Sequence, residues 1–207
     1  MGIIVVAGLG TGVGKTTATA AITHILQKSG RQVIPGKLRN FEGDVSDLKT
    51  IERLTGVPGE DFAASPDPLT RVKELSDAGN TVVIEGAGGI SEPLLGVLTI
   101  ADIAAELDAH LLVVSGHAKG ALNLAVQAVR FARICGAQVS GVLGGALPSG
   151  ADLQTRLRLM EVSKETKVPF LGSMQAGMED LDRESFGQAA EHLMMAERWE
   201  RFIKEYA

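Results

Sequence analysis

The sequence predicts an α/β fold, in which one mainly parallel sheet carries helices on both of its faces. Short apolar runs alternate with helical patterns along the chain, and the runs are continuous, as in strands that are buried on both sides. A glycine-rich loop follows the first of these runs directly and opens a helix. With 207 residues, of which 45% are hydrophobic and 4% aromatic, the chain has the length of a single domain, residues 1–207, with an aliphatic core.

The individual elements follow one another in strand-then-helix order. The predicted strands are short aliphatic runs, at residues 3–7, 32–36, 81–85, 111–115, 139–144 and 169–172. The predicted helices are longer stretches with helical periodicity, at residues 17–29, 44–55, 68–78, 99–107, 122–135, 153–166 and 185–206. The segment 57–67 is the least regular because prolines and a glycine interrupt it, and a surface turn is expected at 149–151. In such sheets ligands bind beyond the carboxyl ends of the strands, so we expect function at the strand ends.

The loop after the first strand reads GLGTGVGKT at residues 8–16. Its glycines let backbone N–H groups approach phosphate oxygens, and the N-terminus of the following helix adds partial positive charge. Lys15 can reach the β- and γ-phosphates of a nucleotide, and the Thr16 hydroxyl can bind Mg²⁺. Five residues separate Gly8 from Gly14, one more than in the usual phosphate-binding loop. Strand, loop and helix nevertheless agree, and together they indicate a P-loop NTPase fold.

Charged residues also stand at the ends of the next two predicted strands. Lys37 ends the second strand and would point into the same crevice as Lys15; the alternative is a surface lysine that starts a loop. Glu85 stands between a β-branched run and a glycine-rich one, where a carboxylate can hold Mg²⁺ or its water. Asp47 lies one turn beyond Asp44, which we expect to cap the helix that follows. Asp47 is then free to bind a metal, or it is an exposed carboxylate of a first helical turn.

Composition limits the classes of function. The net charge is −5 without a basic stripe, so nucleic acid is not an expected partner. The single cysteine, Cys135, cannot form an intramolecular disulfide and fits a reducing compartment. We see no signal peptide and no apolar stretch long enough to span a membrane, so we expect a cytoplasmic protein without membrane contact. No histidine forms a metal-ligand spacing with the cysteine, so no zinc site is predicted.

Together these segments resemble the dethiobiotin synthetase family, ATP-dependent cyclo-ligases of biotin biosynthesis. Members of that family have the longer loop spacing seen at residues 8–16, a lysine that ends the second strand, here Lys37, and a Gly-Asp segment that starts a helix, here 43–48. The family signature Glu-Gly-Ala-Gly-Gly stands here at 85–89, and the segment Gly-x-Leu/Ile-Asn at 120–123. The resemblance covers most of the chain in the same order, so it is far more specific than the loop alone.

The resemblance implies a reaction and its participants. In the family, 7,8-diaminononanoate reacts with CO₂ to form a carbamate. The carbamate attacks the γ-phosphate of ATP to give a carbamic–phosphoric anhydride, and the second amine then closes the ureido ring and expels phosphate. No covalent protein nucleophile is required, because phosphoryl transfer depends mostly on positioning and electrostatics. The resemblance further implies Mg²⁺ as cofactor and a homodimer whose site is shared between the two subunits.

The family's roles fall on particular positions of this chain. The catalytic groups would be Lys37, Lys15 and Thr11. The nucleotide would meet the phosphate loop, the acidic strand end and the end of the fifth main strand: Gly12, Val13, Gly14, Lys15, Thr16, Thr17, Glu85, Gly145, Ala146, Leu147 and Pro148. Mg²⁺ would lie among Thr16, Asp47 and Glu85. The diamine would meet residues of both subunits: Thr11, Lys37, Phe41 and Gly88 from one chain, with Leu122 and Asn123 from the other.

The chain departs from the family pattern on the substrate side. After Lys37 the family usually reads Pro-Val-x-Ser/Thr-Gly, whereas this chain reads LRNFEG at 38–43, so Phe41 replaces a small hydroxyl residue. The region before the third predicted strand is also shorter than usual. Residues 144–148 offer no side chain that reads adenine, so base selection would rest on backbone groups, and other nucleoside triphosphates are compatible.

Two alternative functions stay open at this point. One is a nucleotide-controlled ATPase of the MinD/ParA type, whose output is a dimer rather than a product. The usual signature lysine of that group is missing from the early loop positions Gly8 to Gly10, which disfavours it. The other is a nucleotide-binding paralogue with a different or lost acceptor, which the change at Phe41 favours. Formation of a product from a diamine would separate these alternatives from the ligase.

Overall fold

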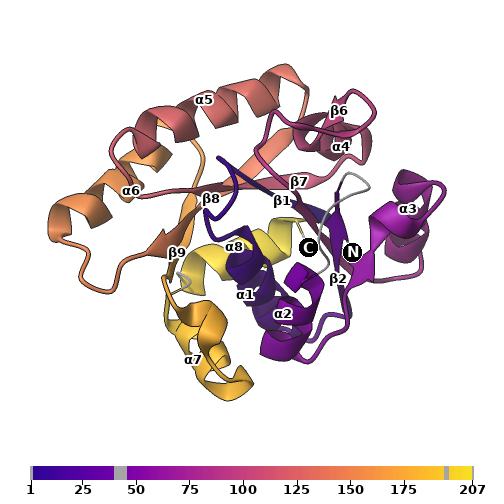
Figure 1. The fold of residues 1–207 in the computed structure, drawn as a ribbon, viewed down its shortest axis with the longest axis horizontal. Helices are drawn as coiled ribbons and strands as arrows, with labels where there is room; N and C mark the ends of the chain where they lie inside the picture. The colour runs from indigo at the N-terminus through magenta and orange to yellow at the C-terminus, as the bar shows by residue number, and fades with distance from the viewer. Residues whose placement is uncertain (1, 40–45, 194–195, 207) are drawn as a thin grey trace.

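The centre of the molecule is a seven-stranded parallel sheet (Figure 1). The computed structural model describes residues 2–39, 46–193 and 196–206. Among these residues the strand order is β3-β2-β4-β1-β7-β8-β9, and all neighbouring pairs run parallel. A small antiparallel hairpin lies outside this sheet. The strands of the main sheet are β1 (Ile3–Gly8), β2 (Val33–Leu38), β3 (Glu60–Asp61), β4 (Thr81–Gly86), β7 (His110–Ser115), β8 (Gln138–Leu147) and β9 (Phe170–Gln175), and those of the hairpin are β5 (Pro93–Leu95) and β6 (Leu98–Thr99).

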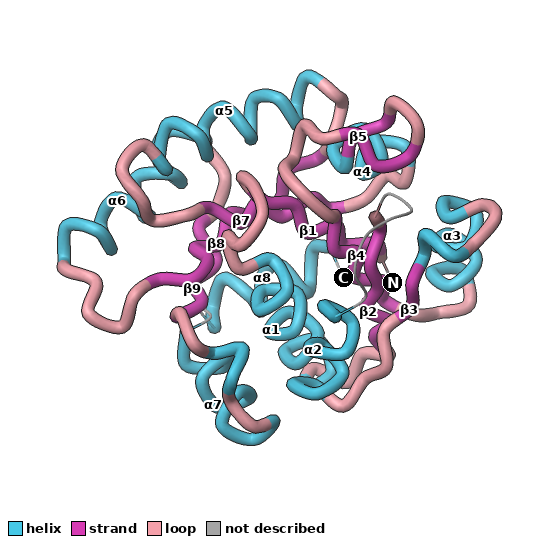
Figure 2. Tube along the Cα trace, viewed as in Figure 1, coloured by secondary structure: helices cyan, strands magenta, loops and turns pink. Residues whose placement is uncertain are grey.

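Helices cover both faces of the sheet, as Figures 1 and 2 show. One face carries α1 (Lys15–Lys28), α2 (Ser46–Thr55), α7 (Arg183–Leu193) and α8 (Ala196–Tyr206). The other carries α3 (Pro68–Asp77), α4 (Ile100–Glu106), α5 (Ala121–Ile134) and α6 (Leu153–Thr166). Two short 3₁₀ helices, η1 (Phe62–Ala64) and η2 (Met178–Asp180), connect strands to the helices that follow. The predicted fold class, a parallel sheet between two helical layers, is confirmed.

The hydrophobic core divides into two layers because successive side chains of a strand point to opposite faces. In β1, Ile3, Val5 and Ala7 pack toward the layer of α3 to α6, whereas Ile4 and Val6 pack toward α1, α2, α7 and α8. All five side chains are buried. A strand covered on both faces offers few positions to polar side chains, which explains the continuous apolar runs of the sequence.

Most predicted elements are present, with bounds that differ by a few residues. The single helix predicted at 185–206 is wrong, because two helices, α7 and α8, occupy this region. Phe186 of α7 and Trp199 of α8 both join the core layer below the sheet. Each helix turns its own apolar stripe toward the sheet, so the sequence shows the same helical period in both and did not separate them; residues 194 and 195, which lie between them, are outside the described residues. Asp44, the predicted cap of α2, lies outside the described residues.

The segment 57–67 is more ordered than its composition indicates. It contains the edge strand β3 and the helix η1, and Asp61 caps that helix by accepting a 3.2 Å hydrogen bond from the backbone N–H of Ala63. Phe62 is fully buried against Gly36 of β2, where a Cβ atom would lie 2.2 Å from the Phe62 ring. The expectation of an irregular segment is therefore corrected. The turn expected at 149–151 is present at residues 149 and 150.

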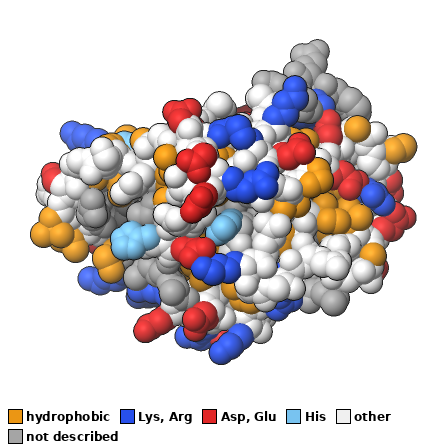
Figure 3. All heavy atoms as spheres, turned by 90° about the horizontal axis from the view of Figure 1, so that it is seen from below, with side chains coloured by type: hydrophobic (Ala, Val, Ile, Leu, Met, Phe, Trp, Pro, Cys, Tyr) orange, Lys and Arg blue, Asp and Glu red, His pale blue; other side chains and the backbone are white. Residues whose placement is uncertain are grey.

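Acidic and basic side chains are interspersed on the face seen from below the sheet (Figure 3). Lys28 of α1 forms an ion pair with Glu191 of α7, and His24 lies 3.0 Å from the same carboxylate. This mixture gives a nucleic-acid backbone no continuous basic surface on the face shown. Within the described part of the chain, none of the helices has both the length and the apolar character that crossing a membrane requires.

Candidate active site

The phosphate loop connects β1 to α1 and lies against the end of β8. Gly12 and Gly14 adopt left-handed backbone angles, with φ values of +74° and +97°, which glycine adopts at little cost. Gly14 is also the N-cap of α1, so the unbonded N–H groups of the first helical turn lie at the loop. A Cβ atom on Gly145 would lie 1.9 Å from the carbonyl oxygen of Val13. The loop and β8 therefore touch through their backbones, which fixes the position of the loop.

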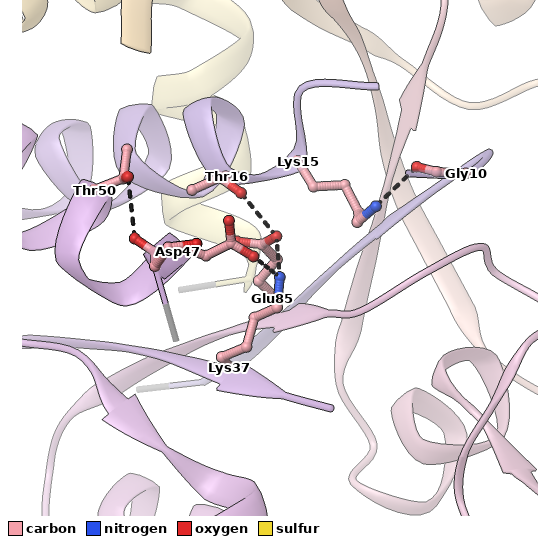
Figure 4. A network of polar contacts seen from close by, with 8 residues as sticks. Gly10, Lys15, Thr16, Lys37, Asp47, Thr50 and Glu85 are labelled. Carbon is pink, nitrogen blue, oxygen red and sulfur yellow. Dashed lines mark hydrogen bonds and ion pairs between the residues drawn. The ribbon is translucent and has the colours of Figure 1, made fainter. Parts of the chain in front are cut away.

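Lys15 folds back over the loop that it follows. The residue is 6% exposed, and its Nζ donates a 2.8 Å hydrogen bond to the Gly10 carbonyl (Figure 4). Burial lowers the pKa of Lys15, and nearby carboxylates, Glu85 above all, oppose this shift. The ammonium group is thus held within the concave loop, where a lysine can contact phosphate oxygens.

Four polar side chains meet at the carboxyl edge of the sheet (Figure 4). Lys37 and Glu85 are neighbours because β2 and β4 are parallel and their register pairs residue 37 with residue 85. Lys37 Nζ donates to Glu85 Oε1 at 2.6 Å, and it also donates to Asp47 Oδ2 from the first turn of α2. Thr16 Oγ1 of α1 donates to the same Glu85 oxygen at 3.0 Å. The structure therefore brings together residues that the sequence had placed at separate strand and helix ends.

Burial governs the electrostatics of this network. Glu85 is 1% exposed, and burial raises its pKa, although Lys37 and the Thr16 hydroxyl favour the charged form. Burial alone would lower the pKa of Lys37, but Glu85 and Asp47 outweigh it, so that pKa is raised. Glu85 Oε2 is buried and makes no hydrogen bond to the residues that the structure describes. Such an oxygen is costly to leave unpaired, so it is suited to a cation or a water molecule.

These side chains line a cavity of about 590 Å³, a volume typical of small-molecule sites. The cavity lies between the phosphate loop, the ends of β2 and β4, and the first turn of α2. Most residues that the sequence assigned to the site line it: Thr11, Gly12, Gly14, Lys15, Thr16, Thr17, Lys37, Asp47, Glu85, Gly88 and Ala146. Residues predicted to bind phosphate, metal and substrate are thus all represented in this one cavity.

The predicted residues at the start of α5 lie elsewhere. Leu122 and Asn123 line a second cavity, of about 220 Å³, between the segment after β7 and α6. Its charged lining residues include Lys119, Arg158 and Glu161. Within one chain, Leu122 and Asn123 are therefore not among the residues around the phosphate-loop cavity.

The other residues predicted to bind the nucleotide lie in different surroundings: at a neighbouring cavity, in the core and at the surface. Val13 and Gly145 line a further cavity of about 320 Å³ that also borders the phosphate loop. The Leu147 side chain is part of the hydrophobic core, whereas Pro148 is exposed beyond the end of β8. Phe41, expected at the substrate, lies outside the described residues.

Several residues that line the cavity were not predicted: Arg39, Ser46, Thr50, Ala87 and Glu179. A signal existed for Arg39, because strand alternation places it on the same side as Lys37, two residues earlier. Thr50 follows Asp47 at helical spacing, and its hydroxyl donates to the Ser46 carbonyl (Figure 4). Glu179 comes from η2 after β9, and its sequence neighbourhood carries no motif.

A magnesium ion fits the donor set at Thr16, Asp47 and Glu85. Among the described residues no cluster of three or more His, Cys, Asp or Glu side chains forms a metal cage. Mg²⁺ is usually held by one or two carboxylates together with substrate phosphates and water, so two carboxylates and one hydroxyl are sufficient. The buried Oε2 atom of Glu85 supplies an oxygen that lacks a protein partner in the described chain. The chemistry of these donors therefore agrees with a hard cation.

The fold and the loop define the class of the protein: it is a P-loop NTPase. Solved structures with a similar fold include the signal recognition particle receptor FtsY of Elizabethkingia anophelis in complex with GDP. Its TM-score is 0.64 at 20% identity, over 91% of this chain and 62% of that one. The MinC:MinD cell division protein complex of Aquifex aeolicus gives a TM-score of 0.64 at 16% identity, over 92% of this chain and 93% of that one. At such identities the similarity concerns the fold.

Sequence relatives narrow the class to one family. A family model described as an AAA domain matches residues 60–185. The ATP-dependent dethiobiotin synthetase BioD of Corynebacterium diphtheriae is 38% identical, over 96% of this chain and 100% of the relative. The enzyme of the same name from Corynebacterium glutamicum strain R is 38% identical over 86% and 89%, and that of Rhodococcus jostii is 32% identical over 92% and 93%. The chain belongs to the ATP-dependent dethiobiotin synthetase family.

Proposed function

We propose that this chain is a dethiobiotin synthetase, which closes the ureido ring of 7,8-diaminononanoate with CO₂ at the expense of ATP. The observation that carries the proposal is the position of Lys37. Glu85 and Asp47 hold its ammonium group in the cavity that the phosphate loop also lines. A carbamate and a triphosphate are both anionic, and a cation at this place lowers their repulsion. Membership of the family supplies the substrate class.

The proposed reaction needs no covalent protein intermediate. One amine of the substrate attacks the carbon of CO₂, forms an N–C bond and loses a proton to give the carbamate. A carbamate oxygen then attacks the γ-phosphorus of ATP, and the bond to ADP breaks. The second amine attacks the carbonyl carbon of the resulting anhydride, phosphate leaves, and a proton is released as the ring closes.

The residues of the chain would act on this sequence by positioning and by charge. Lys15 and the N–H groups at the start of α1 would hold the triphosphate. For this, Lys15 Nζ would exchange the Gly10 carbonyl for phosphate oxygens. Lys37 and Thr11 would face the carbamate, and the backbone at Gly88 would contact the diamine. Such positioning and electrostatic stabilisation supply most of the catalysis in phosphoryl transfer.

Mg²⁺ is part of the proposal. Thr16, Asp47 and Glu85 would hold it, since all three residues line the cavity beside the phosphate loop. When bound, the ion supplies neutralisation of the β- and γ-phosphate charge. The ammonium group of Lys37 contacts the carboxylates of Asp47 and Glu85. When these carboxylates bind Mg²⁺, the ammonium group would stay beside them and face the substrate.

We also propose that the backbone at the end of β8 meets the nucleotide base. Gly145 and Ala146 border the cavities around the phosphate loop. Leu147 would contribute through its backbone, because its side chain belongs to the core. Backbone groups discriminate bases less strictly than an asparagine side chain, so CTP and GTP are compatible co-substrates beside ATP.

A homodimer accounts for the position of Leu122 and Asn123 away from their own phosphate-loop cavity. The neighbouring helix α6 exposes apolar side chains on one stripe: Leu153 is 72% exposed, Leu157 49% and Met160 47%. A second subunit would cover this stripe, and Leu122 and Asn123 of the first subunit would then lie at the acceptor site of the second. The expected effect of Leu157→Glu is a shift from dimer to monomer in light scattering, with loss of diamine affinity. Val97→Glu, in the exposed turn between β5 and β6, should leave the dimer intact.

The proposed function is tested by assaying the purified protein with Mg²⁺, bicarbonate and 7,8-diaminononanoate, with ATP, CTP and GTP in parallel. Dethiobiotin should form with one phosphate released per molecule of product, and the three nucleotides would be ranked in the same experiment. Tight nucleotide binding without product would contradict the proposal and favour a paralogue with another acceptor. A nucleotide-dependent dimer without product would favour the partitioning-ATPase class.

A further inference from the structure

The ammonium group of Lys37 contacts both of the carboxylates that the proposed function gives to Mg²⁺. Its Nζ donates to Glu85 Oε1 at 2.6 Å and also to Asp47 Oδ2 (Figure 4). A lysine ammonium group and a hard divalent cation bind the same kind of partner, the oxygen atoms of a carboxylate. Lys37 and a metal ion therefore compete for this pair of carboxylates.

The surroundings of Lys37 hold its ammonium group in this position. The side chain of Lys37 is 6% exposed and that of Glu85 is 1% exposed. The register of β2 and β4 pairs residue 37 with residue 85, so the backbone fixes the two side by side. Two opposite charges that have lost their hydration at this depth stabilise one another, and removal of either leaves a costly buried charge. Lys37 is thus a built-in counter-cation of Glu85.

The charges beside the phosphate loop are balanced. Lys15, Lys37, Asp47 and Glu85 line the cavity together, two of them positive and two negative. A free divalent cation gains no net attraction from a neutral set of this kind, and Mg²⁺ loses its bound water reluctantly. A metal ion that arrives with a triphosphate keeps phosphate oxygens as ligands, and the phosphate charge offsets its repulsion by the two lysines. The set therefore favours the metal–nucleotide complex over the metal alone.

One carboxylate oxygen of this set is outside the contacts of Lys37. Glu85 Oε1 accepts from Lys37 and, at 3.0 Å, from the Thr16 hydroxyl. Glu85 Oε2 is buried and makes no hydrogen bond to the residues that the structure describes. A metal ion that brings its own compensating phosphate charge can use this oxygen while Lys37 stays beside Oε1. Lys37 thus limits the charge that the carboxylates offer without blocking every donor atom.

We propose that Lys37 excludes free Mg²⁺ from the carboxylates of Asp47 and Glu85, so that the metal binds only together with the nucleotide. Lys37 is in this view a specificity-determining residue, which makes the metal site selective for a metal–triphosphate complex over the metal alone. The inference rests on the proposed function, because the metal site is part of it. It gives Lys37 a role in metal binding that is separate from its proposed contact with the carbamate.

The test measures binding of the metal alone, without nucleotide or diamine. Mn²⁺, which also prefers oxygen ligands, is titrated into wild type and Lys37→Gln, and the loss of its solution EPR signal reports binding, with Mg²⁺ as competitor. Lys37→Gln keeps a hydrogen-bond donor but removes the positive charge. It should bind Mn²⁺ roughly a hundredfold more tightly than wild type, as expected for removal of one like charge near the ion. Lys37→Arg, which keeps the charge, should bind Mn²⁺ as weakly as wild type.

Equal Mn²⁺ affinities of wild type and Lys37→Gln would overturn the inference. Lys37→Gln combined with Asp47→Asn should return to weak binding, and tight binding by this double variant would place the metal elsewhere and also overturn it. Lys28→Gln is the matched control, because Lys28 pairs with Glu191 at a different cavity, and this variant should bind as weakly as wild type.

Thermal unfolding gives a second measurement. Mg²⁺ alone should raise the melting temperature of Lys37→Gln and leave that of wild type unchanged, because only the variant binds the free metal. If Lys37→Gln does not fold without metal, Mg²⁺ alone should restore its fold, and failure to do so would overturn the inference.

Dethiobiotin formation is assayed separately, so the two proposals can fail independently. A wild type that excludes the free metal through Lys37 but forms no dethiobiotin would contradict the proposed function alone. A wild type that forms dethiobiotin and binds Mn²⁺ without nucleotide as tightly as Lys37→Gln would contradict this inference alone.

Discussion

The two ends of the cavity are built on different physical principles. At the phosphate end, one continuous segment supplies almost everything: the loop, Lys15 and Thr16 follow β1 directly. Backbone conformation does much of the work, since Gly12 and Gly14 adopt left-handed angles and the loop packs on Gly145. At the end where β2 and β4 stop, side chains from separate segments must meet, such as Lys37 of β2 and Glu85 of β4 with Asp47 of α2.

This difference explains why the residues at one end of a site are easier to predict from the sequence than those at the other end. A phosphate is recognised by backbone N–H groups in a fixed local geometry, so its signature is contiguous in the sequence. An acceptor is recognised by its particular shape and charge, and those are met by long-range contacts. The Lys37 to Glu85 pair lies at the junction and joins the two ends. Substitutions can therefore be chosen that affect one end, the other, or the junction.

The largest effect is expected at the junction. Lys37→Ala should lower kcat by about a hundredfold to a thousandfold, the usual cost of removing one group that stabilises transition-state charge. Nucleotide affinity should change little, because the phosphate loop is intact. The variant should also lose roughly 3–5 kcal/mol of stability, since Glu85 would keep a buried charge without its cation. Chemical denaturation and steady-state kinetics measure both effects.

A second substitution separates the two consequences of losing Lys37. Lys37→Ala combined with Glu85→Gln removes the buried charge and should recover most of the stability but none of the activity. If kcat recovered along with stability, Lys37 would have a structural role only, and its proposed role in catalysis would be contradicted.

The phosphate end is tested by Lys15→Ala, which should weaken ATP binding about a hundredfold through loss of charge-assisted hydrogen bonds. The fold should be retained, because the Lys15 ammonium contacts a loop carbonyl rather than the core. Lys28→Ala, at the exposed end of the same helix, is the control. Unchanged nucleotide affinity in Lys15→Ala would contradict the assignment of residues 8–16 as the phosphate-binding loop.

A smaller effect should follow at the backbone contact behind the loop. In Gly145→Ala the new methyl group would lie 1.9 Å from the Val13 carbonyl oxygen, so the loop or β8 must shift. We expect a loss of about 1–3 kcal/mol in stability and weaker nucleotide binding. Gly150→Ala is the matched control, because a Cβ there meets no atom within 4 Å. Equal melting temperatures and nucleotide affinities for both variants would show that the loop is not braced by β8.

The smallest effect should come from a site that belongs to neither end. Thr99 caps α4 by accepting from the Asp102 N–H, while the Asp102 carboxylate accepts from the Thr99 N–H. Thr99→Ala should cost about 1 kcal/mol of stability. The kinetic constants should stay unchanged, because α4 lines none of the cavities around the phosphate loop in the described chain. A change in kcat would show that this face of the sheet is coupled to the site.

Prediction from the sequence was most successful where the signal is local. The strands of the main sheet apart from β3, the phosphate loop, Lys37 and Glu85 were all expected, and the parallel register explains why the last two meet. The edge strand β3 and the helix η1 were missed, because two paired residues carry no period and Phe62 is held by long-range packing on Gly36 of β2. Glu179 was missed because strand order, which brings its segment to the cavity, is not encoded locally, whereas strand alternation from Lys37 could have indicated Arg39.

The central claim is that the phosphate end and the acceptor end meet to form a ureido ring, and single-turnover analysis with labelled carbon tests it most directly. Enzyme in excess over ATP is mixed with ¹³C-bicarbonate and 7,8-diaminononanoate. The reaction is quenched, and the masses of the products are measured by mass spectrometry. The account predicts dethiobiotin that carries one ¹³C atom, with one ADP formed per molecule of product. ADP formed without labelled dethiobiotin would contradict it, and so would ATP that stays unreacted although bicarbonate and the diamine are present at saturating concentrations.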